Sequence, residues 1–324
     1  MTELGYAISS DEHSPLDLVK NARLAEEAGF GFALISDHYH PWIDEQGHSP
    51  FVWGIIGAIA QATERLALGT GVTAPTIRIH PAIIAQAAAT SACLLPGRFF
   101  LGVGTGENLN EHILGDRWPP FELRIEMLEE AIEVMRLLWQ GGMQTHYGEH
   151  YVVENARVYD LPEQPVRVMV AAGGEQAAQL AGSVGDGLIA TSPDEATMKA
   201  YEAAAGKGKP RYGQLTLCWA EDRDEAISTA HRVWPNAALP GQLSQDLLLP
   251  MHYEQASTLV TEEQIAEMMP CGPDARPVLD QIEEYGRVGF THVYLHQIGP
   301  DQEGFVSWAR RAILPELAGV HGRR

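Results

Sequence analysis

The sequence predicts a single α/β domain folded as a closed (β/α)8 barrel. Short apolar segments alternate about eight times with segments of helical periodicity, the order that gives a parallel sheet. Polar and Gly-rich residues follow the expected strands, whereas mostly Gly, Pro and Arg precede them, and barrel enzymes place their chemistry after the strands. The length of 324 residues suits one large barrel. An open doubly wound sheet stays possible, because periodicity cannot show closure.

Each expected strand is a short apolar run that ends at Gly or at a polar residue. The runs cover residues 4–8, 32–35, 66–70, 98–103, 166–171, 187–191, 214–219 and 291–296. Apolar residues recur at helical spacing over 15–28, 51–65, 81–95, 121–140, 195–205, 222–234, 273–286 and 302–318, and a short helix starts at Glu175. Gly29 suits the end of the first helix, and Pro81 suits the start of the third.

Two segments interrupt this alternation. Residues 141–165 form an irregular excursion in which 145–151 suggests a hairpin. Residues 235–272 are rich in Pro, Leu and Met without a clean period. No stretch resembles an interdomain linker, a close repeat or a low-complexity segment. We therefore expect one domain over residues 1–324, with both segments inserted at its carboxyl-terminal mouth.

The charge balance restricts the partners. Lys and Arg number 22 against 43 Asp and Glu, so the formal net charge is −21, and such a surface repels nucleic acid and anionic membranes. An anionic ligand would need a local site of backbone amides or a few cations. The three cysteines have neither disulfide nor zinc spacing, and unpaired thiols favour the cytoplasm. The first residues lack a signal-peptide pattern, and no apolar run is long enough to cross a bilayer.

A cluster of reactive side chains follows the second expected strand. Asp37, His38, His40 and Trp42 all lie within seven residues of its end, a position that indicates the rim of an active site. His38 and His40 are candidate metal ligands, as in metal-dependent amidohydrolases, but that family usually has the pair after strand one and an Asp after strand eight. We therefore expect no metal. Hydrogen bonding for His40 and core packing for Trp42 are the structural alternatives.

Two Gly-rich segments are further candidate sites. Residues 102–107 approach the dinucleotide pattern G-x-G-x-x-G, but the third Gly is Glu107. A carboxylate flanked by glycines suits an acid held in place for chemistry, and a solvated loop Glu is the alternative. Gly173 and Gly174 precede a helix and can form a nest of backbone amides for a phosphate. An ordinary turn that needs positive φ explains these two glycines equally well.

Four motifs follow one another in a specific order. They are Ser36-Asp37-His38-x-x-Pro41-Trp42, LGTGVTAPT at 68–76, GVGTGE-x-LNE at 102–111 and AAGG at 171–174. Together they resemble those of the F420-dependent glucose-6-phosphate dehydrogenases, a branch of the bacterial luciferase-like flavin and deazaflavin oxidoreductases. The likeness covers nearly the whole chain and is weakest over 235–272. It implies a luciferase-like barrel, usually a homodimer, which holds coenzyme F420 at its carboxyl-terminal mouth and passes hydride from an alcohol to C5 of the deazaflavin.

The resemblance implies roles position by position. His38 matches the catalytic His, Glu107 the catalytic Glu and Trp42 an active-site Trp. Asp37 matches a residue that contacts the coenzyme, and Gly71-Val72 matches a non-proline cis peptide behind the deazaflavin ring. The other matching coenzyme-binding positions are Ala74, Thr105, Gly106, Asn110, Gly173, Gly174, Gln176 and Ala177.

Elementary chemistry agrees with these roles. Removal of hydride from a carbinol carbon requires loss of the hydroxyl proton, and an imidazole that titrates near neutrality, here His38, is a suitable base. The coenzyme gains negative charge at N1–C2 as hydride arrives. A carboxyl group such as Glu107, kept protonated by poor solvation, can supply the balancing proton. Trp42 can wall the pocket and donate its indole N–H to the substrate oxygen.

The substrate positions depart from the family pattern. The sugar-phosphate enzymes hold the phosphate with a Thr, matched by Thr191, and with basic residues. Asp194 and Glu267 occupy the positions expected to be basic, and two acids repel a phosphate dianion. We therefore expect the same reaction on a non-phosphorylated sugar or a small secondary alcohol. The alternatives are an FMN-dependent monooxygenase on the same barrel, a metal-dependent hydrolase, and a deazaflavin-binding protein without turnover.

Overall fold

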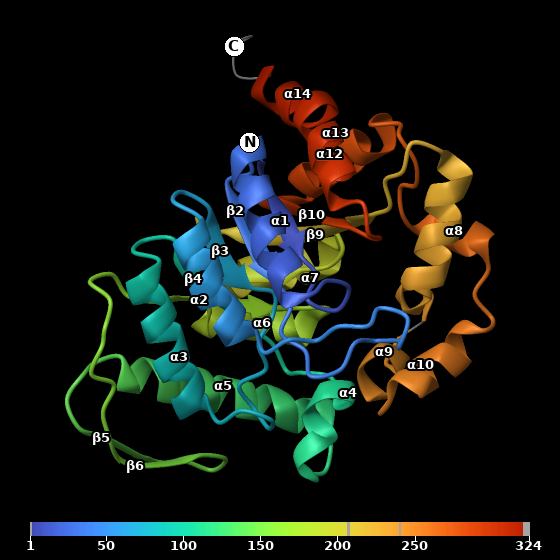
Figure 1. Cartoon of the computed structure of the whole chain (residues 1–324). Coiled ribbons are helices and arrows are strands. Elements are labelled where there is room, and N and C mark those ends of the chain that lie inside the picture. Colours follow the sequence, from blue (N-terminus) through green and yellow to red (C-terminus); the bar gives the residue numbers. More distant parts are fainter. Residues whose placement is uncertain (1, 206–207, 240, 320–324) are drawn as a thin grey trace.

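The computed structural model describes residues 2–205, 208–239 and 241–319. Eight parallel strands close into a barrel in the order β1-β10-β9-β8-β7-β4-β3-β2, and Figure 1 shows these strands surrounded by helices. The strands cover Glu3–Ile8 (β1), Phe32–Ile35 (β2), Ala67–Thr70 (β3), Phe99–Val103 (β4), Arg167–Ala171 (β7), Gly187–Ala190 (β8), Arg211–Leu217 (β9) and His292–Gln297 (β10). Closure of the sheet confirms the predicted barrel and removes the open-sheet alternative.

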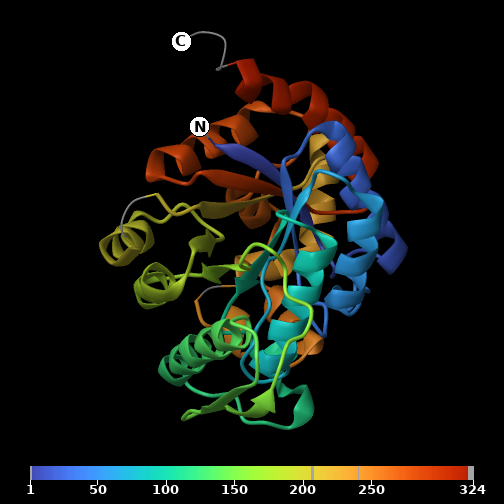
Figure 2. The ribbon, with the colours of Figure 1, turned by 90° about the vertical axis from the view of Figure 1, so that its left-hand side faces the viewer.

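Helices cover the outside of the barrel, and all but the last of them, α13, lie in connections from one barrel strand to the next. In Figure 2 the blue helices α1 and α2 lie on one side of the strands and the yellow-green α6 and α7 on the other. The covering helices are α1 (Pro15–Ala28), α2 (Val52–Ala62), α3 (Pro81–Leu94), α5 (Phe121–Leu138), α6 (Glu175–Val184), α7 (Glu195–Ala205), α12 (Arg276–Val288) and α13 (Gln302–Ala312). Their caps follow the sequence signals: the Ser14 side chain accepts from the amide of Asp17, and Gly29 ends α1 with φ 106°.

The strands are buried on both faces, which explains their continuous apolar runs. Side chains that point into the barrel fill its interior, as in other eight-stranded barrels. The inward cluster is Ala7, Phe32, Leu34, Phe100, Met169, Ile189, Tyr212 and Tyr294. The alternate side chains pack outward against the helices in a second, larger core. The barrel is therefore a packed support, and ligands have access only at its ends.

Several boundaries differ from the prediction by a few residues, and two of the differences have identifiable reasons. β9 begins at Arg211 and not at residue 214, because the Arg211 backbone pairs with Thr291 although the side chain is polar. The last predicted helix is divided into α13 and α14 (Leu314–Gly319). Pro315 lacks the N–H that would continue the helix and breaks it at Ile313.

The two irregular segments lie outside the barrel. The first contains the expected hairpin, with β5 (Gln144–Tyr147) paired antiparallel to β6 (Val152–Ala156). The second follows α8 (Arg223–Val233) and contains η2 (Pro235–Ala238), α9 (Leu243–Asp246), α10 (Pro250–Ser257) and α11 (Glu262–Met268). Figure 1 shows α8 to α10 beside the barrel, with α9 close to α4 (Asn108–Glu111). The Asn108 side chain donates to the carbonyl of Asp246 at 3.0 Å, which joins this segment to the loop after β4.

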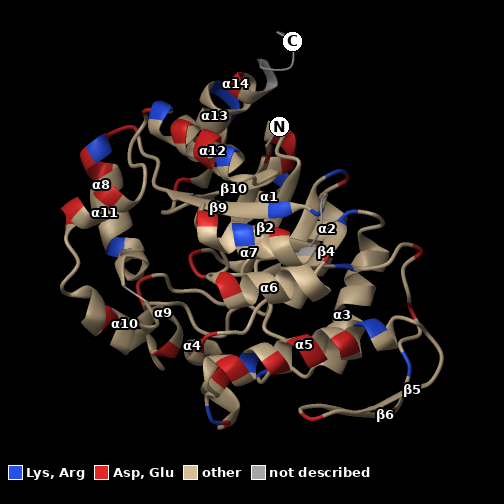
Figure 3. Ribbon diagram, turned by 180° about the vertical axis from the view of Figure 1, so that it is seen from behind, with Lys and Arg blue, Asp and Glu red and all other residues tan. Residues whose placement is uncertain are grey.

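The outer helices carry much of the acidic surface. Figure 3 shows Asp and Glu repeated along α5, with few Lys and Arg among them. Of the helices that the structure describes, none has the length and apolar character needed to cross a membrane.

Candidate active site

Candidate site residues follow five neighbouring strands at the carboxyl-terminal mouth. Asp11 follows β1, His38 follows β2, Gly71 follows β3, Glu107 follows β4 and Gly173 follows β7. Because β1, β2, β3, β4 and β7 are consecutive around the closed barrel, their loops form one continuous arc. Residues separated by more than 150 positions in sequence therefore border the same site.

His38 is held by a carboxylate that the sequence analysis missed. Its Nδ1 lies 2.8 Å from Oδ1 of Asp11, and its side chain is 10% exposed. The second Asp11 oxygen, Oδ2, accepts from the Ser36 hydroxyl at 3.0 Å. With Nδ1 directed at Asp11, Nε2 is the ring nitrogen that remains for a ligand. The pair is a carboxylate–imidazole dyad of the kind that fixes a catalytic His in one orientation.

The surroundings of His38 raise the pKa of its imidazole above the ordinary value. Burial alone would lower the pKa of the imidazole, but the charge and hydrogen bond of Asp11, followed by the charges of Glu107 and Asp37, outweigh it and raise the pKa to about 9. In the protein without ligands, the pKa of His38 is thus raised above the near-neutral value expected for a free imidazole. At neutral pH the ring is an imidazolium and a proton donor.

Trp42 forms an aromatic wall beside this imidazole. Its ring packs edge-on against His38, with 5.1 Å between centroids, and edge-on against Tyr253 of α10 at 5.3 Å. It also contacts the apolar cluster that contains Trp234 and Met269. Trp42 thus joins the His38 loop to the 235–272 segment. Its packing against this apolar cluster agrees in part with the structural alternative, in which Trp42 is a core residue.

Glu107 stands at the start of α4, opposite the His38 loop. Its Oε2 accepts from the Asn110 amide at 3.4 Å, and its side chain is half-buried. Oδ1 of Asn110 accepts from the backbone N–H groups of Tyr39 at 2.8 Å and His40 at 3.1 Å. Asn110 is buried, so it positions the two loops that carry His38 and Glu107. A direct contact between Asn110 and a coenzyme stays a prediction.

A buried ionic network lies beneath these loops. Arg78 donates to Oδ1 of Asp37 at 2.9 Å, its backbone N–H donates to Oε2 of Glu111 at 2.7 Å, and its Nε lies 3.5 Å from Oε1 of Glu111. The Thr73 hydroxyl donates to the other Asp37 oxygen at 2.7 Å. Asp37 was expected to touch the coenzyme, yet its side chain is 1% exposed and its oxygens are already occupied. It ties the loops after β2 and β3 together, and coenzyme contact stays a prediction.

Glu111 is a second carboxyl group with altered acidity. Desolvation raises its pKa, the amide and charge of Arg78 oppose this, and the charges of Glu107 and Asp37 add to it, with the result that the pKa is about 7. It lies directly behind the Gly106 backbone, since a Cβ on Gly106 would approach Glu111 Cγ to 2.9 Å and Ala74 Cβ to 3.1 Å. Gly106 also has φ 80°, which favours glycine. Ala74, Gly106 and Glu111 are therefore in direct contact.

The backbone at the mouth agrees with the resemblance. The Gly71-Val72 peptide bond is cis. A Cβ at Gly71 would lie 2.9 Å from Leu34 Cβ, so the close approach of β2 requires glycine there. The half-buried Val72 side chain packs on the inward cluster of the barrel, beside Gly104. Thr105 follows, also half-buried.

The loop after β7 has room for a ligand. Neither Gly173 nor Gly174 has positive φ, and no atom lies within 4 Å of a Cβ built on either residue. The alternative explanation, a turn in which these glycines need positive φ, is therefore wrong. The open space in front of the α6 N-terminus suits a phosphate bound by backbone amides. Gln176 is exposed on α6, whereas the Ala177 side chain is buried in the core, so only the Ala177 backbone can face the mouth. These features fit the phosphate-bearing, ring-containing coenzyme that the resemblance implies.

The two histidines of the rim do not share a site. His40 Nδ1 lies 2.9 Å from the carbonyl of Leu109, and its ring stacks on His112 with 5.8 Å between centroids. His38 is directed at Asp11. His40 thus fastens the rim to α4, in agreement with its structural alternative. No group of three or more His, Cys, Asp and Glu side chains among the described residues is arranged to hold a metal ion.

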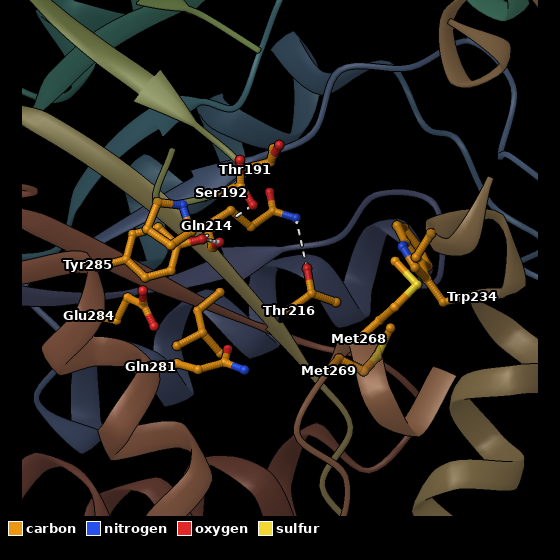
Figure 4. A pocket seen from close by; sticks show the side chains of 13 residues that line it. Thr191, Ser192, Gln214, Thr216, Trp234, Met268, Met269, Gln281, Glu284 and Tyr285 are labelled. Carbon is orange, nitrogen blue, oxygen red and sulfur yellow. Dashed lines mark hydrogen bonds between the residues drawn. The ribbon is translucent and has the colours of Figure 1, made fainter. Parts of the chain in front are cut away.

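The three expected substrate residues have different surroundings. Thr191 lines a cavity after β8 and β9, shown in Figure 4. Asp194 does not, because its Oδ2 accepts from the Thr197 backbone at 2.6 Å and begins α7. Glu267 is exposed on α11, outside the residues that line the cavity. Asp194 thus caps a helix and Glu267 faces solvent, and contact of either residue with a substrate stays a prediction.

Three residues of the site escaped the sequence analysis for different reasons. Asp11 lies at the end of the first strand, where the strand-end argument would have found it if it had been applied there. Glu111 belongs to a noted motif, but its burial depends on contacts with Arg78 and Gly106. Arg78 stands alone in the sequence and has no local signal.

Comparisons with known proteins agree with this geometry. A family model described as luciferase-like monooxygenase matches residues 1–292. An F420-dependent glucose-6-phosphate dehydrogenase of Nocardia farcinica is 38% identical over 98% of both chains, and one of Mycolicibacterium fortuitum is 36% identical over 97% of this chain and 98% of its own.

One solved structure is similar over nearly its whole length. An F420-dependent secondary alcohol dehydrogenase in complex with an F420-acetone adduct has a TM-score of 0.90 and 30% sequence identity, covering 96% of this chain and 98% of that one. Identity and coverage of this extent show common descent as well as a common fold. This chain therefore belongs to the bacterial luciferase-like family, in the branch that contains the F420-dependent glucose-6-phosphate dehydrogenases.

Proposed function

We propose that this protein is an F420-dependent dehydrogenase that oxidises a CH–OH group. The Asp11–His38 dyad at the mouth, beside Trp42 and facing the loop of Glu107, is the observation that supports it most directly. Relatives named for F420-dependent oxidation of glucose 6-phosphate or of a secondary alcohol support the same reaction. The coenzyme, when bound, supplies the carbon that accepts hydride.

His38 handles the proton of the reacting hydroxyl. Nε2 takes this proton when the alcohol loses hydride and returns it in the reverse direction, while Asp11 holds Nδ1 and balances the imidazolium charge. Because the pKa of His38 is raised to about 9, the protonated ring at neutral pH favours the carbonyl-reducing direction. Oxidation accelerates as rising pH removes the proton. Trp42 packs against the ring and excludes water from it.

Glu107 carries the second proton of the reaction. Its carboxyl group accepts from Asn110 and stands near His38, close enough for its charge to act on that imidazole. In the protonated form it can neutralise the negative charge that develops on the hydride acceptor. Glu111, whose pKa is about 7 and which touches the same loop, helps keep negative charge in this region low at neutral pH.

The backbone of the mouth would hold the coenzyme. Gly71, Val72, Ala74, Thr105 and Gly106 border the centre of the arc and would contact the ring system of the coenzyme. Gly173, Gly174 and the first amides of α6 would receive a phosphate. Backbone amides provide this anion site without cations, which agrees with the net charge of −21.

Reconstitution with F420 tests the proposal. Oxidised F420 should lose its absorbance when a secondary alcohol or a neutral sugar is added, and FMN in its place should give no turnover. His38→Ala and Glu107→Gln should each lower hydride transfer by about 10²–10⁴-fold, while the Kd for F420 changes only a few-fold. His48→Ala, an exposed imidazole of the same loop, is the matched control and should behave as wild type.

Two results would contradict the proposal: full activity of both variants, and activity with FMN alone. Efficient turnover of glucose 6-phosphate without any turnover of neutral alcohols would retain the reaction type but overturn the expected preference for non-phosphorylated substrates.

A further inference from the structure

Glu111 is a buried carboxyl group with one oxygen that has no hydrogen-bond partner among the described residues. Its side chain, at the end of α4, is 1% exposed. Oε2 accepts from the backbone N–H of Arg78 at 2.7 Å, whereas Oε1 lies 3.5 Å from Nε of Arg78 without a hydrogen bond. A carboxylate oxygen that is removed from water and left without a donor is costly, which favours the neutral form of the group.

Acids outnumber cations among the groups whose charges reach Glu111. Asp37 follows β2 and Glu107 precedes α4, and the charges of both raise the pKa of the Glu111 carboxyl. Arg78, which follows β3, is the cation of this group, and it lies closer to Asp37, at 2.9 Å, than to Glu111. Tyr151 of the hairpin, whose pKa is raised by burial, is present as a neutral phenol. Three acids thus share one guanidinium, an arrangement that favours retention of a proton by one of them.

Of these three acids, Glu111 has the weakest support for a negative charge. Asp37 accepts from both Arg78 and the Thr73 hydroxyl, and Glu107 is half-buried, so water reaches it. Glu111 accepts from one backbone N–H, and desolvation raises its pKa to about 7 although the amide and charge of Arg78 oppose the shift. The proton of the cluster therefore resides on Glu111.

Glu111 also lies against residues that are expected to hold the coenzyme. A Cβ built on Gly106 would come within 2.9 Å of Glu111 Cγ and 3.1 Å of Ala74 Cβ. F420 is an anion at neutral pH, and further negative charge develops at N1–C2 of its ring as hydride arrives. Because the Glu111 carboxyl is buried, a charge placed against Gly106 is only weakly screened from it.

We propose that Glu111 stores a proton behind Gly106 and keeps it when the anionic coenzyme binds. Negative charge against Gly106 disfavours the carboxylate form of Glu111, so the protein that carries this proton binds the coenzyme more tightly. At neutral pH part of the free protein lacks the proton and takes it up from solvent on binding. Glu111 acts through the Gly106 loop and is a positioning residue. This proton linkage rests on the proposed F420 dependence and adds to it a proton that is not the one carried by His38.

The free protein tests where the proton resides. The infrared carbonyl band of one protonated carboxyl group should disappear as pH rises from about 6 to about 8 in the wild type, and it should be missing throughout this range in Glu111→Gln. The amide of Gln resembles the protonated acid in shape and can still accept from the Arg78 backbone. Glu129→Gln removes an exposed acid of α5 by the same substitution and should leave the band and its midpoint unchanged.

Binding of F420 tests the linkage. Isothermal titration calorimetry in two buffers with different heats of ionisation should show that the wild type takes up about half a proton more at pH 7 than Glu111→Gln does. Between pH 6 and pH 8 the Kd should rise by about five- to tenfold more in the wild type than in Glu111→Gln. Ionisation of the coenzyme itself is common to both proteins and cancels in this comparison. Glu129→Gln should match the wild type.

The outcomes separate this inference from the proposed function. A carboxyl band that persists in Glu111→Gln overturns the inference, as does equal proton uptake by the wild type and Glu111→Gln. Loss of the uptake in Glu107→Gln but not in Glu111→Gln would overturn it by assigning the proton to Glu107. Each of these results leaves the proposed function standing if an alcohol or sugar reduces F420. If F420 does not bind, the proposed function and the inference both fail.

Discussion

At the residue scale, a single buried neighbour controls the protonation of His38. Asp11 contacts the imidazole at 2.8 Å, and its charge and hydrogen bond are the main causes that raise the pKa to about 9 against the opposing effect of burial. The Asp11–His38 pair stabilises the folded protein, and its contribution is complete below about pH 6.5, the pKa of His in an unfolded chain. This stabilisation is lost as pH rises through about 9. Catalysis and stability should therefore depend on pH through the same group.

Replacement of Asp11 by Asn should shift the pH dependence of alcohol oxidation. In the wild type, kcat/KM should rise with pH and level off above about 9, because oxidation requires the neutral ring of His38. Asp11→Asn keeps a hydrogen-bonding group at Nδ1 but removes its charge, so the midpoint should fall by about 1–3 pH units. A pH profile of kcat/KM under F420 saturation measures the shift.

An acid elsewhere on the surface provides the control for this prediction. Asp17→Asn changes an exposed carboxylate on α1 by the same substitution and should leave the midpoint unchanged. An unshifted midpoint in Asp11→Asn would show that Asp11 does not set the acidity of the group that titrates. Asp11 acts through His38, so it is a positioning residue.

At the element scale, one carboxylate of α5 holds the turn of the β5–β6 hairpin. Glu130 of α5 accepts from the backbone N–H groups of Glu149, His150 and Tyr151 at 2.9–3.1 Å and contacts His146 Nε2 at 3.1 Å. Burial would raise the pKa of Glu130, but the hydrogen bonds from His150 and Tyr151, followed by that from His146, outweigh it and lower the pKa. The hairpin turn thus depends on an ionised acid.

Glu130→Gln should loosen the hairpin. A neutral amide accepts the three backbone N–H groups less strongly, and hydrogen bonds to charged groups contribute about 1.5–3 kcal/mol. Amide hydrogen exchange should therefore accelerate at residues 149–151, while the barrel strands keep their protection. Because folding lowers the pKa of Glu130, the ionised carboxylate stabilises the hairpin turn at any pH above about 4.3, the pKa of Glu in an unfolded chain. This stabilisation is lost as the pH falls through the lower pKa that Glu130 has in the folded protein.

Glu133 lies one turn further along α5 and is exposed, so Glu133→Gln is the control and should leave exchange at 149–151 unchanged. Equal exchange in the wild type and Glu130→Gln would show that other contacts hold the hairpin.

At the scale of the whole molecule, the dominant electrostatic feature is the excess of acids. The formal net charge of −21 is spread over the outer helices, as Figure 3 shows for α5. Like charges repel one another in the compact state, and salt screens this repulsion over about 10 Å at 0.1 M. The homodimer that the resemblance implies stays a prediction, and its subunits would have to associate despite this charge.

Salt should therefore stabilise the folded protein. The Tm should rise by several degrees between about 10 mM and 300 mM NaCl at pH 7.5, because screening relieves repulsion among 43 acids that only 22 Lys and Arg residues balance. Differential scanning calorimetry at constant protein concentration measures the change. Equimolar sucrose serves as a control for effects unrelated to charge, and a Tm that falls with NaCl would contradict the prediction.

Sequence and tertiary structure determined different parts of this protein. Local periodicity and strand-end residues predicted the barrel, the rim with His38 and Trp42, and the placed acid Glu107, because strand ends converge in any such barrel. Motif order identified the branch, and the cis Gly71-Val72 bond agrees with it. These features depend on short stretches of chain and on the general geometry of the fold.

Contacts between distant segments decided the rest. Asp11 meets His38 across 27 positions, Arg78 joins Asp37 to Glu111, and the cavity brings Thr191 to Met268. The pKa of an imidazole or a carboxyl depends on burial and on charges a few ångströms away, and no local pattern records them. For the same reason, the sequence did not show that the Asp194 side chain caps α7 or that Glu267 is exposed to solvent.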